Sequence, residues 1–195
     1  KDQRDRMFEL MAAHFDDVHR HTFERDLAEK QWAVILRDAQ TGAIQGFSTL
    51  MLVEVEVEGQ PIKAVFSGDT IVHRDYWGES ELATVWGTFV LSLAESHRGT
   101  PFYWFLISKG FRTYKFLPLY FRDYWPRHDA PTPGFEDQLI QALAESKFPG
   151  RFDAGTGVIR FDGLKDRLRG DLAEVSEGRL KDPAVRFFLE RNPSY

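Results

Sequence analysis

Apolar residues at the start of the chain follow the period of a helix. In residues 7–15 they recur at intervals of three and four, which places them on one helical face. Phe23 and Leu27 have the same spacing and indicate a second, shorter helix that ends near Lys30. Two helices are therefore expected before the first strand.

The residues that follow change to the pattern of strands. The apolar run 32–36 ends before the turn residues Thr41-Gly42, and a second strand is expected over 44–57. A third strand is expected over 62–72, where Ser-Gly-Asp-Thr at 67–70 interrupts the apolar residues. Glycine inside a strand often marks a bulge or a close backbone approach, so we expect one here.

The clearest helix of the sequence lies at 82–93. Its apolar residues define one helical face, and Ser80 is placed to cap the first turn. The apolar run 102–107 is typical of a buried strand, and a further helix is expected after it, ending before Pro126. Because parallel strands need a crossover, we expect the strands 62–72 and 102–107 to be parallel neighbours.

The pattern is weaker in the last third of the chain. The expected elements there are a helix at 135–148, a short strand at 157–161 and short helices at 164–174 and 183–190. With 195 residues, 43% of them hydrophobic, the chain can bury one substantial core, whereas two cores would leave each half small. We therefore expect a single α/β domain over 1–195, with its core at 5–125.

Composition narrows the function classes. The chain has 25 basic and 30 acidic residues without a dense basic cluster, so nucleic acid is not an expected partner. No apolar run approaches the roughly 20 residues of a membrane span, and the charged start is unlike a signal peptide. A cytoplasmic protein is expected. Without cysteine, any catalysis has to use oxygen or nitrogen groups.

Histidines near the N-terminus raise the question of a metal site. His14, His19 and His21 surround Asp16 and Asp17, and all five side chains are potential ligands. Their spacing matches no compact ligand motif, and the segment joins two expected helices. A solvated loop is the expected structure, and no metal is expected.

A hydrolase triad is a second alternative. Ser67, Asp69 and His73 are the residue types of such a triad. No Gly-x-Ser-x-Gly sequence surrounds the serine, which is the turn that exposes the nucleophile in one large hydrolase class. Hydrolysis by a serine nucleophile is therefore not favoured.

The order of the expected elements resembles that of the GNAT N-acetyltransferases over roughly residues 5–125. Two helices, a meander of three strands, a helix, a strand and another helix is the order found in that superfamily. Three stretches support the resemblance: the interrupted strand 67–72, the turn 75–80 and the segment 107–114. The resemblance implies a mixed, mostly antiparallel central sheet flanked by helices, with one splayed parallel strand pair.

The resemblance also implies a binding site for an acyl donor. In that superfamily the pantetheine arm lies where two parallel strands splay apart, and the pyrophosphate binds the following turn and helix start. The backbone amides of Thr70, Ile71 and Val72 would then polarise the thioester carbonyl. The other residues that the resemblance places at the donor are Arg74, Gly78, Glu79, Ser80, Ser108, Lys109 and Arg112.

The expected phosphate turn departs from the family pattern, which is Gln or Arg, two residues, Gly, any residue, then Gly or Ala. The matching positions are Asp75, Gly78 and Ser80, so only the glycine fits. Asp75, Glu79 and Glu81 add negative charge where a pyrophosphate would bind. Four residues could compensate for it: Arg74, Lys109, Arg112 and Lys115. The chain would be a divergent, bacterial-type member, and acyl carrier protein, whose phosphopantetheine has one phosphate, is an alternative donor to acetyl-CoA or another acyl-CoA.

Acyl transfer from a thioester to an amine needs a proton acceptor for the amine and a proton for the leaving thiolate. Asp69 at the interrupted strand could take the amine proton, and His73 is a second candidate. The resemblance places Tyr114 near a tyrosine that often protonates the thiolate, with Tyr120 six residues further. Both roles have structural alternatives: an aspartate beside glycine often bonds local backbone, and a buried tyrosine often belongs to the core.

Aromatic residues are concentrated in 102–125, which holds eleven of the twenty-eight in the chain. They fit either a dense core or the lining of a groove for a medium or long acyl chain or a bulky acceptor. The hypothesis is an N-acyltransferase that moves an acyl group to a small-molecule or peptide amine by direct attack. The alternative is a GNAT-like binding module without catalysis. The oligomeric state is not encoded in these patterns.

Overall fold

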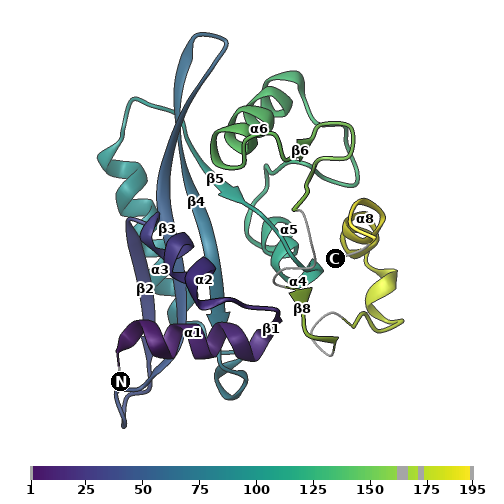
Figure 1. The fold of residues 1–195 in the computed structure, drawn as a ribbon. Coiled ribbons are helices and arrows are strands. Elements are labelled where there is room, and N and C mark those ends of the chain that lie inside the picture. The colour runs from purple at the N-terminus through teal and green to yellow at the C-terminus, as the bar shows by residue number, and fades with distance from the viewer. Residues whose placement is uncertain (1, 162–166, 171–173, 194–195) are drawn as a thin grey trace.

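The computed structural model describes residues 2–161, 167–170 and 174–193, and its main feature is a four-stranded sheet (Figure 1). In sheet order the strands are β2 (Trp32–Arg37), β3 (Ile44–Val57), β4 (Gln60–Val72) and β5 (Phe102–Leu106). The first three are antiparallel, and β5 is parallel to β4. This confirms the expected fold class of a mixed, mostly antiparallel central sheet with one parallel pair.

Three helices cover one face of this sheet. The helices α1 (Gln3–His14) and α2 (Arg20–Ala28) confirm the two expected N-terminal helices, and their apolar residues pack on Phe47 of β3. The helix α6 (Gly134–Lys147) packs near Val53, further along the same strand. Because Phe47 and Val53 are an even number of residues apart, both clusters lie on the same face.

The helix α3 (Glu81–Ser96) lies on the opposite face. Its Phe89 ring is 5.4 Å from that of Trp32, and its Trp86 ring is 4.8 Å from that of Trp104. The expected apolar face is only partly used, because Val85 is 55% exposed. Ser80 holds the N-cap position as expected, but its side chain makes no capping hydrogen bond.

The sequence predicts one helix after β5 that ends near residue 125, and this prediction is wrong in its length. Two short helices are present instead, α4 (Phe111–Tyr114) and α5 (Phe116–Tyr120). Pro118 explains the break, because its ring opposes the carbonyl of the residue four positions earlier, which is Tyr114. The chain therefore leaves the helix well before Pro126.

The C-terminal part lies beside the sheet, next to α4 and α5 (Figure 1). The hairpin β6 (Phe152–Asp153) and β7 (Val158–Ile159) confirms a short strand in 157–161, and α8 (Pro183–Arg191) confirms the last helix. A helix is expected at 164–174, but residues Arg167–Leu168 form the strand β8, so the prediction is wrong there. This strand pairs with β1 (Phe15–Asp16). Residues 164–166 and 171–173 of the expected helix lie outside the described ranges. The β1–β8 pair joins the end of α1 to the C-terminal part.

Candidate functional site

The parallel strands β4 and β5 part halfway along β4. They are paired only from Lys63 to Ser67, opposite Phe102 to Leu106. Beyond this point β4 continues to Val72, whereas the chain after β5 turns into α4. We call this point the fork. The parallel pairing is confirmed, and the parting of the two strands agrees with the splay that the resemblance implies.

A bulge in β4 lies directly at the fork. Ser67 pairs with Leu50, and Thr70 pairs with Ser48, so Thr49 alone faces the two residues Gly68 and Asp69. A Cβ atom at position 68 would lie 2.4 Å from Thr49 Oγ1 and 2.7 Å from Lys30 Cε. Any larger residue here would force the side chains of Thr49 and Lys30 to move.

Beyond the bulge, part of the β4 main chain faces the edge that β5 has left. The His73 amide donates to the Gln45 carbonyl on the β3 side at 2.7 Å. Since successive residues of a strand direct their amides to opposite edges, Ile71 also faces β3, whereas Thr70 and Val72 face away from it. No strand of the described chain pairs with β4 along that edge.

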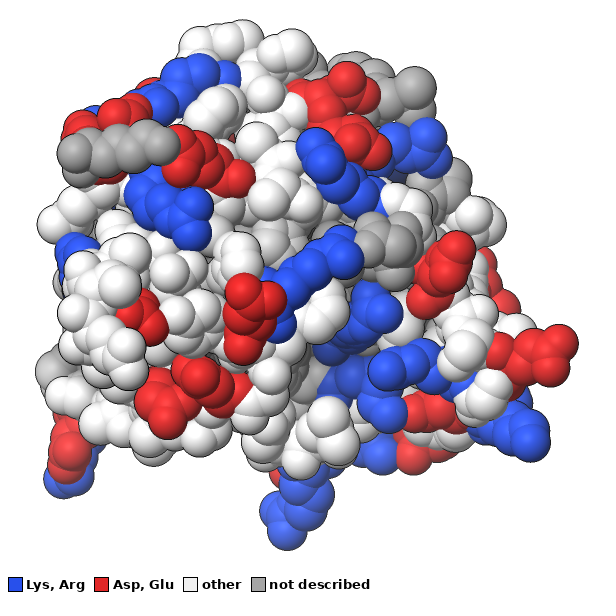
Figure 2. Space-filling model, turned by 90° about the horizontal axis from the view of Figure 1, so that it is seen from below, with Lys and Arg blue, Asp and Glu red and all other residues white. Residues whose placement is uncertain are grey.

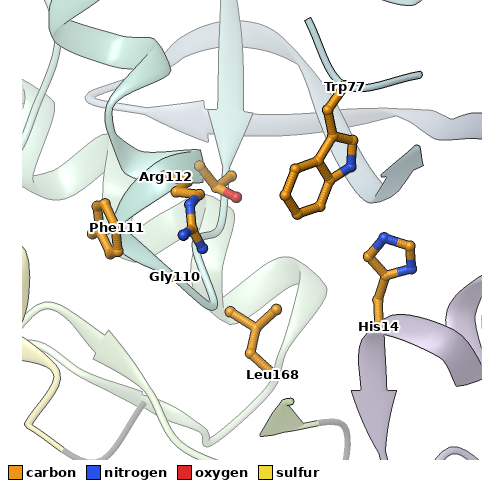
Figure 3. A pocket seen from close by; sticks show the side chains of 7 residues that line it. His14, Trp77, Gly110, Phe111, Arg112 and Leu168 are labelled. Atoms are coloured by element: carbon orange, nitrogen blue, oxygen red, sulfur yellow. The ribbon is translucent and has the colours of Figure 1, made fainter. Parts of the chain in front are cut away.

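A cavity of about 130 Å³ lies close to this edge (Figure 3). Trp77, in the turn after β4, forms one wall, and its Nε1 donates to the Val72 carbonyl at 2.8 Å. The end of α1, the start of α4 and strand β8 form the rest. The lining residues are His14, Trp77, Gly110, Phe111, Arg112, Thr113 and Leu168. We call it the His14 cavity.

Cationic side chains lie around this cavity. Each is within 5.1–5.8 Å of the centroid of a neighbouring ring: Arg74 over Trp77, Lys109 over Phe15, and Arg112 and Arg179 over Phe111. The view from below shows Lys and Arg side chains gathered around the middle of that face (Figure 2). Lys115, also expected to supply positive charge, is bonded instead to Asp182 at the start of α8.

Lys30 and Asp69 lie near each other at the bulge. Lys30 Nζ donates to the Asp26 carbonyl at 2.8 Å and lies 5.7 Å from the centroid of the Phe66 ring. Burial lowers the pKa of Lys30, and the charge of Lys147 lowers it further, whereas the charge of Asp69 raises it. The fork therefore has an amine and a carboxylate beside a main-chain edge that no strand of the described chain covers.

The other expected catalytic side chains, Tyr114 and His73, each form a local hydrogen bond. The Tyr114 hydroxyl donates to the Pro126 carbonyl at 2.9 Å, and its ring packs among residues of α8. Burial raises the pKa of Tyr114 far above its ordinary value. His73 follows directly on β4, and its Nδ1 accepts from the Asp75 amide at 3.4 Å. Their catalytic roles stay predictions.

The turn after β4 begins with a short 3₁₀ helix, η1 (Arg74–Tyr76). The Tyr76 hydroxyl donates to Asp38 Oδ2 at 2.6 Å, which ties the turn to the loop between β2 and β3. Gly78 has a φ of 99°, a left-handed conformation that favours glycine. Glu79 and Ser80 are exposed beside it, while Ser108 is half-buried between β5 and α4. Whether these residues bind a donor stays a prediction.

Neither a metal site nor a membrane span is found in the described ranges. There, no three His, Asp or Glu side chains gather as metal ligands would, and the rings of His19 and His21 stack with centroids 5.7 Å apart. Of the helices described, none combines the length and the apolar character needed to cross a bilayer.

Sequence patterns did not reveal the His14 cavity. The sequence pattern offers His14 only as a potential metal ligand in a loop, and it predicts Leu168 in a helix. Two facts of the fold bring them together: α1 ends at His14, and the adjacent β1 pairs with β8 across a long separation in sequence. A pairing of two residues has no periodicity that a sequence could display.

The comparisons with known proteins find similarity in fold. No protein-family model matches the sequence, and no curated protein matches it. Glucosamine-6-phosphate N-acetyltransferase from Arabidopsis thaliana is 14% identical, with a TM-score of 0.47 over 67% of this chain and 92% of that one. An acetyltransferase from Trypanosoma brucei is 16% identical, with a TM-score of 0.46 over 68% and 96%. The GNAT-family N-acetyltransferase YhbS from Escherichia coli, solved in complex with CoA, is 18% identical, with a TM-score of 0.37 over 50% and 53%. At these identities the likeness concerns the fold alone.

Proposed function

We propose that the protein is an N-acyltransferase that moves an acyl group from a phosphopantetheine thioester to an amine. The observation that carries this proposal is the bulge at Gly68 beside the fork. It leaves the main chain of Thr70 and Val72 directed at an edge without a strand partner, next to a cavity. Preorganised amides of this kind stabilise the negative charge that develops on a carbonyl oxygen under attack.

The proposed reaction is a direct transfer. The amine nitrogen attacks the thioester carbonyl, a C–N bond forms and the C–S bond breaks. Asp69 takes the amine proton, directly or through water, and the leaving thiolate takes a proton, for which Tyr114 is the proposed source. Support for Asp69 comes from its position in the bulge. No covalent intermediate with the protein is needed.

The cations around the His14 cavity support an anionic donor. Because Glu79 and Glu81 stand at the start of α3, we propose that the phosphates bind near Arg74, Lys109 and Arg112 rather than on the α3 amides. Acetyl-CoA or another acyl-CoA is the proposed donor, with acylated carrier protein as the alternative. A small-molecule or peptide amine is the proposed acceptor.

The aromatic residues Trp104 and Phe105 of β5 support a short acyl group. Phe105 packs on Phe66, and Trp104 contacts both Trp86 and Phe121. Their rings are thus used in packing on the two faces of the sheet. The lining of a long groove would instead need rings that face a common space.

The alternative function is a binding module that takes no acyl donor, and the acidic turn after β4 favours it. A thermal shift assay distinguishes this alternative from the proposed transferase. CoA, acetyl-CoA, longer acyl-CoAs and acylated carrier protein are each added at a hundred times their expected Kd, which stabilises a binder by about 2.7 kcal/mol. A shift with a thioester, followed by acyl transfer to an amine, supports the transferase. No shift with any of these donors refutes it.

A further inference from the structure

His14 has a buried lone pair without a partner in the described part of the chain. Its Nδ1 lies 2.8 Å from the Leu10 carbonyl oxygen. Since a carbonyl only accepts, Nδ1 has the proton, and Nε2 of the neutral ring is an acceptor. The residue is 8% exposed, and no described residue bonds Nε2. Native proteins leave few buried polar atoms unsatisfied, so this nitrogen needs a physical explanation.

The His14 ring lines the cavity, and its unpartnered nitrogen is on the side of the ring toward Trp77. In Figure 3 the outer side of the His14 ring points toward Trp77 and the space between them, and the two ring centroids are 6.4 Å apart. Among the described residues, the other buried side-chain atom without a partner is Thr49 Oγ1, at the bulge. The two unsatisfied atoms therefore lie on α1 and β3, which pack together in one apolar cluster.

The walls of the cavity define which group would satisfy Nε2. Trp77, Phe111 and Leu168 are apolar. Arg112 supplies donors but no acceptor, and Thr113 adds one hydroxyl group. The volume of about 130 Å³ is close to that of an engineered apolar cavity that takes up benzene, about 150 Å³. A ligand group of this size that is apolar and has one N–H matches both the walls and the lone pair.

We propose that the His14 cavity binds a small apolar group that has an N–H, and that His14 Nε2 accepts a hydrogen bond from it. The inference rests on the proposed function, because that function offers two sources of such a group. One is the acceptor amine, and the other is an amide of the pantetheine arm. In the amide the N–H lies between a carbonyl and a methylene group, and in a primary amine it is bonded to a single carbon. In both cases His14 is a binding residue that orients the ligand.

The test compares variants that keep or remove the acceptor. His14→Phe keeps a ring but has no lone pair, whereas His14→Gln keeps an acceptor. His21→Phe is the matched control, because His21 is an exposed histidine in the first turn of α2. Leu168→Phe fills the cavity without changing His14, which keeps the proposal testable if a His14 variant does not fold. For each variant, calorimetry gives the Kd for CoA, and transfer assays give the KM for benzylamine and for ethanolamine.

One lost buried hydrogen bond weakens binding by about tenfold. If the amide of the carrier is the source, His14→Phe raises the Kd for CoA by this factor. If the acceptor amine is the source, His14→Phe raises the KM for benzylamine more than the KM for ethanolamine and leaves the Kd for CoA unchanged. His14→Gln regains part of the loss, Leu168→Phe repeats it, and His21→Phe changes neither value. Unchanged Kd and KM values in both His14→Phe and Leu168→Phe overturn the inference.

A second readout separates this inference from the proposed function. In protein with ¹⁵N-labelled histidine, N-methylacetamide should shift the Nε2 resonance of His14, and N,N-dimethylacetamide, which has no N–H, should not. If the wild type binds no thiol carrier and transfers no acyl group, the proposed function fails, while this pair of probes still tests the cavity. Equal shifts with both amides, or no shift with either, overturn the inference.

Discussion

Gly68 and Tyr114 illustrate how single residues determine the shape of the site. At position 68 the space of a Cβ is occupied by Thr49 Oγ1 and Lys30 Cε, so the Lys30 side chain, which follows α2, packs closely on the bulge because position 68 has no side chain. At Tyr114 a polar group that is present matters instead, because its buried side chain donates a hydrogen bond to the Pro126 carbonyl.

Replacing Gly68 should therefore disturb both folding and function. We expect Gly68→Ala to lower the free energy of unfolding by about 1–3 kcal/mol, as overpacking does, and to lower acyl transfer. Gly87→Ala is the control, because position 87 is inside α3 with no atom within 4 Å of an added Cβ. It should gain about 0.5–1 kcal/mol. Urea denaturation measures both variants, and a Gly68→Ala protein as stable as the wild type would contradict the steric argument.

Tyr114→Phe separates a structural role from a catalytic one. The variant leaves the Pro126 carbonyl without its donor, so we expect a loss of about 1 kcal/mol in the free energy of unfolding. If the hydroxyl also protonates the thiolate, kcat falls while the Kd for CoA stays constant. Full activity in this variant would remove Tyr114 from the mechanism.

At the scale of the elements, short connections position the site. The hydrogen bond from Tyr76 to Asp38 joins the turn after β4 to the loop between β2 and β3. The break at Pro118 separates α4 from α5, so the start of α4 stays beside the His14 cavity. Long periodic elements such as α1, α3, α6 and the strands β2 to β5 could be predicted from the sequence, because their apolar residues repeat. Pairing across a long separation, as between Leu168 and Phe15, leaves no such repeat.

The bond between Tyr76 and Asp38 should be visible in the acid stability of the protein. The Tyr76 hydroxyl, followed by Thr41, lowers the pKa of Asp38 from its ordinary 3.8 to about 2. A lowered carboxyl pKa stabilises the folded state above the ordinary value, and the stabilisation is lost as the pH falls from 3.8 toward about 2. We expect Tyr76→Phe to be less stable than the wild type above that range and to converge with it near pH 2.

The measurement is the denaturant midpoint as a function of pH. Tyr120→Phe serves as the control, because Tyr120 is 69% exposed on α5. Parallel stability curves for Tyr76→Phe and the wild type at all pH values would show that this bond does not couple the turn to protonation.

At the scale of the whole molecule, the C-terminal part completes the site. The bulge, the fork and the order of the sheet follow from patterns that the sequence displays. The cavity wall at Leu168 does not follow from such patterns, because it needs β8 beside β1. The wall at α4 also depends on the C-terminal part, because α4 packs against α8. Phe111 and Tyr114 of α4 pack with Val185 and Phe188 of α8 in one cluster. Residues far apart in sequence thus stabilise the same wall of the cavity.

Phe188→Ala tests this dependence. Phe188 is 3% exposed, and we expect its truncation to cost about 3–5 kcal/mol, as for other buried phenylalanines. Because α4 lies on this cluster, ligand binding at the cavity should weaken as well. Leu180→Ala, at a side chain that is 40% exposed, is the control and should change stability little. A destabilised Phe188→Ala protein with unaltered ligand binding would show that α4 keeps its position without α8.

The pairing of β1 with β8 has a consequence for substrate range. Leu168 borders the cavity from a segment that contributes nothing to the four-stranded sheet. Trimming this one side chain to alanine would deepen the space under His14 while the bulged strand stays as it is. If the proposed function holds, selectivity for bulkier ligands can be engineered, or drift during evolution, independently of the proposed carbonyl site at the bulge.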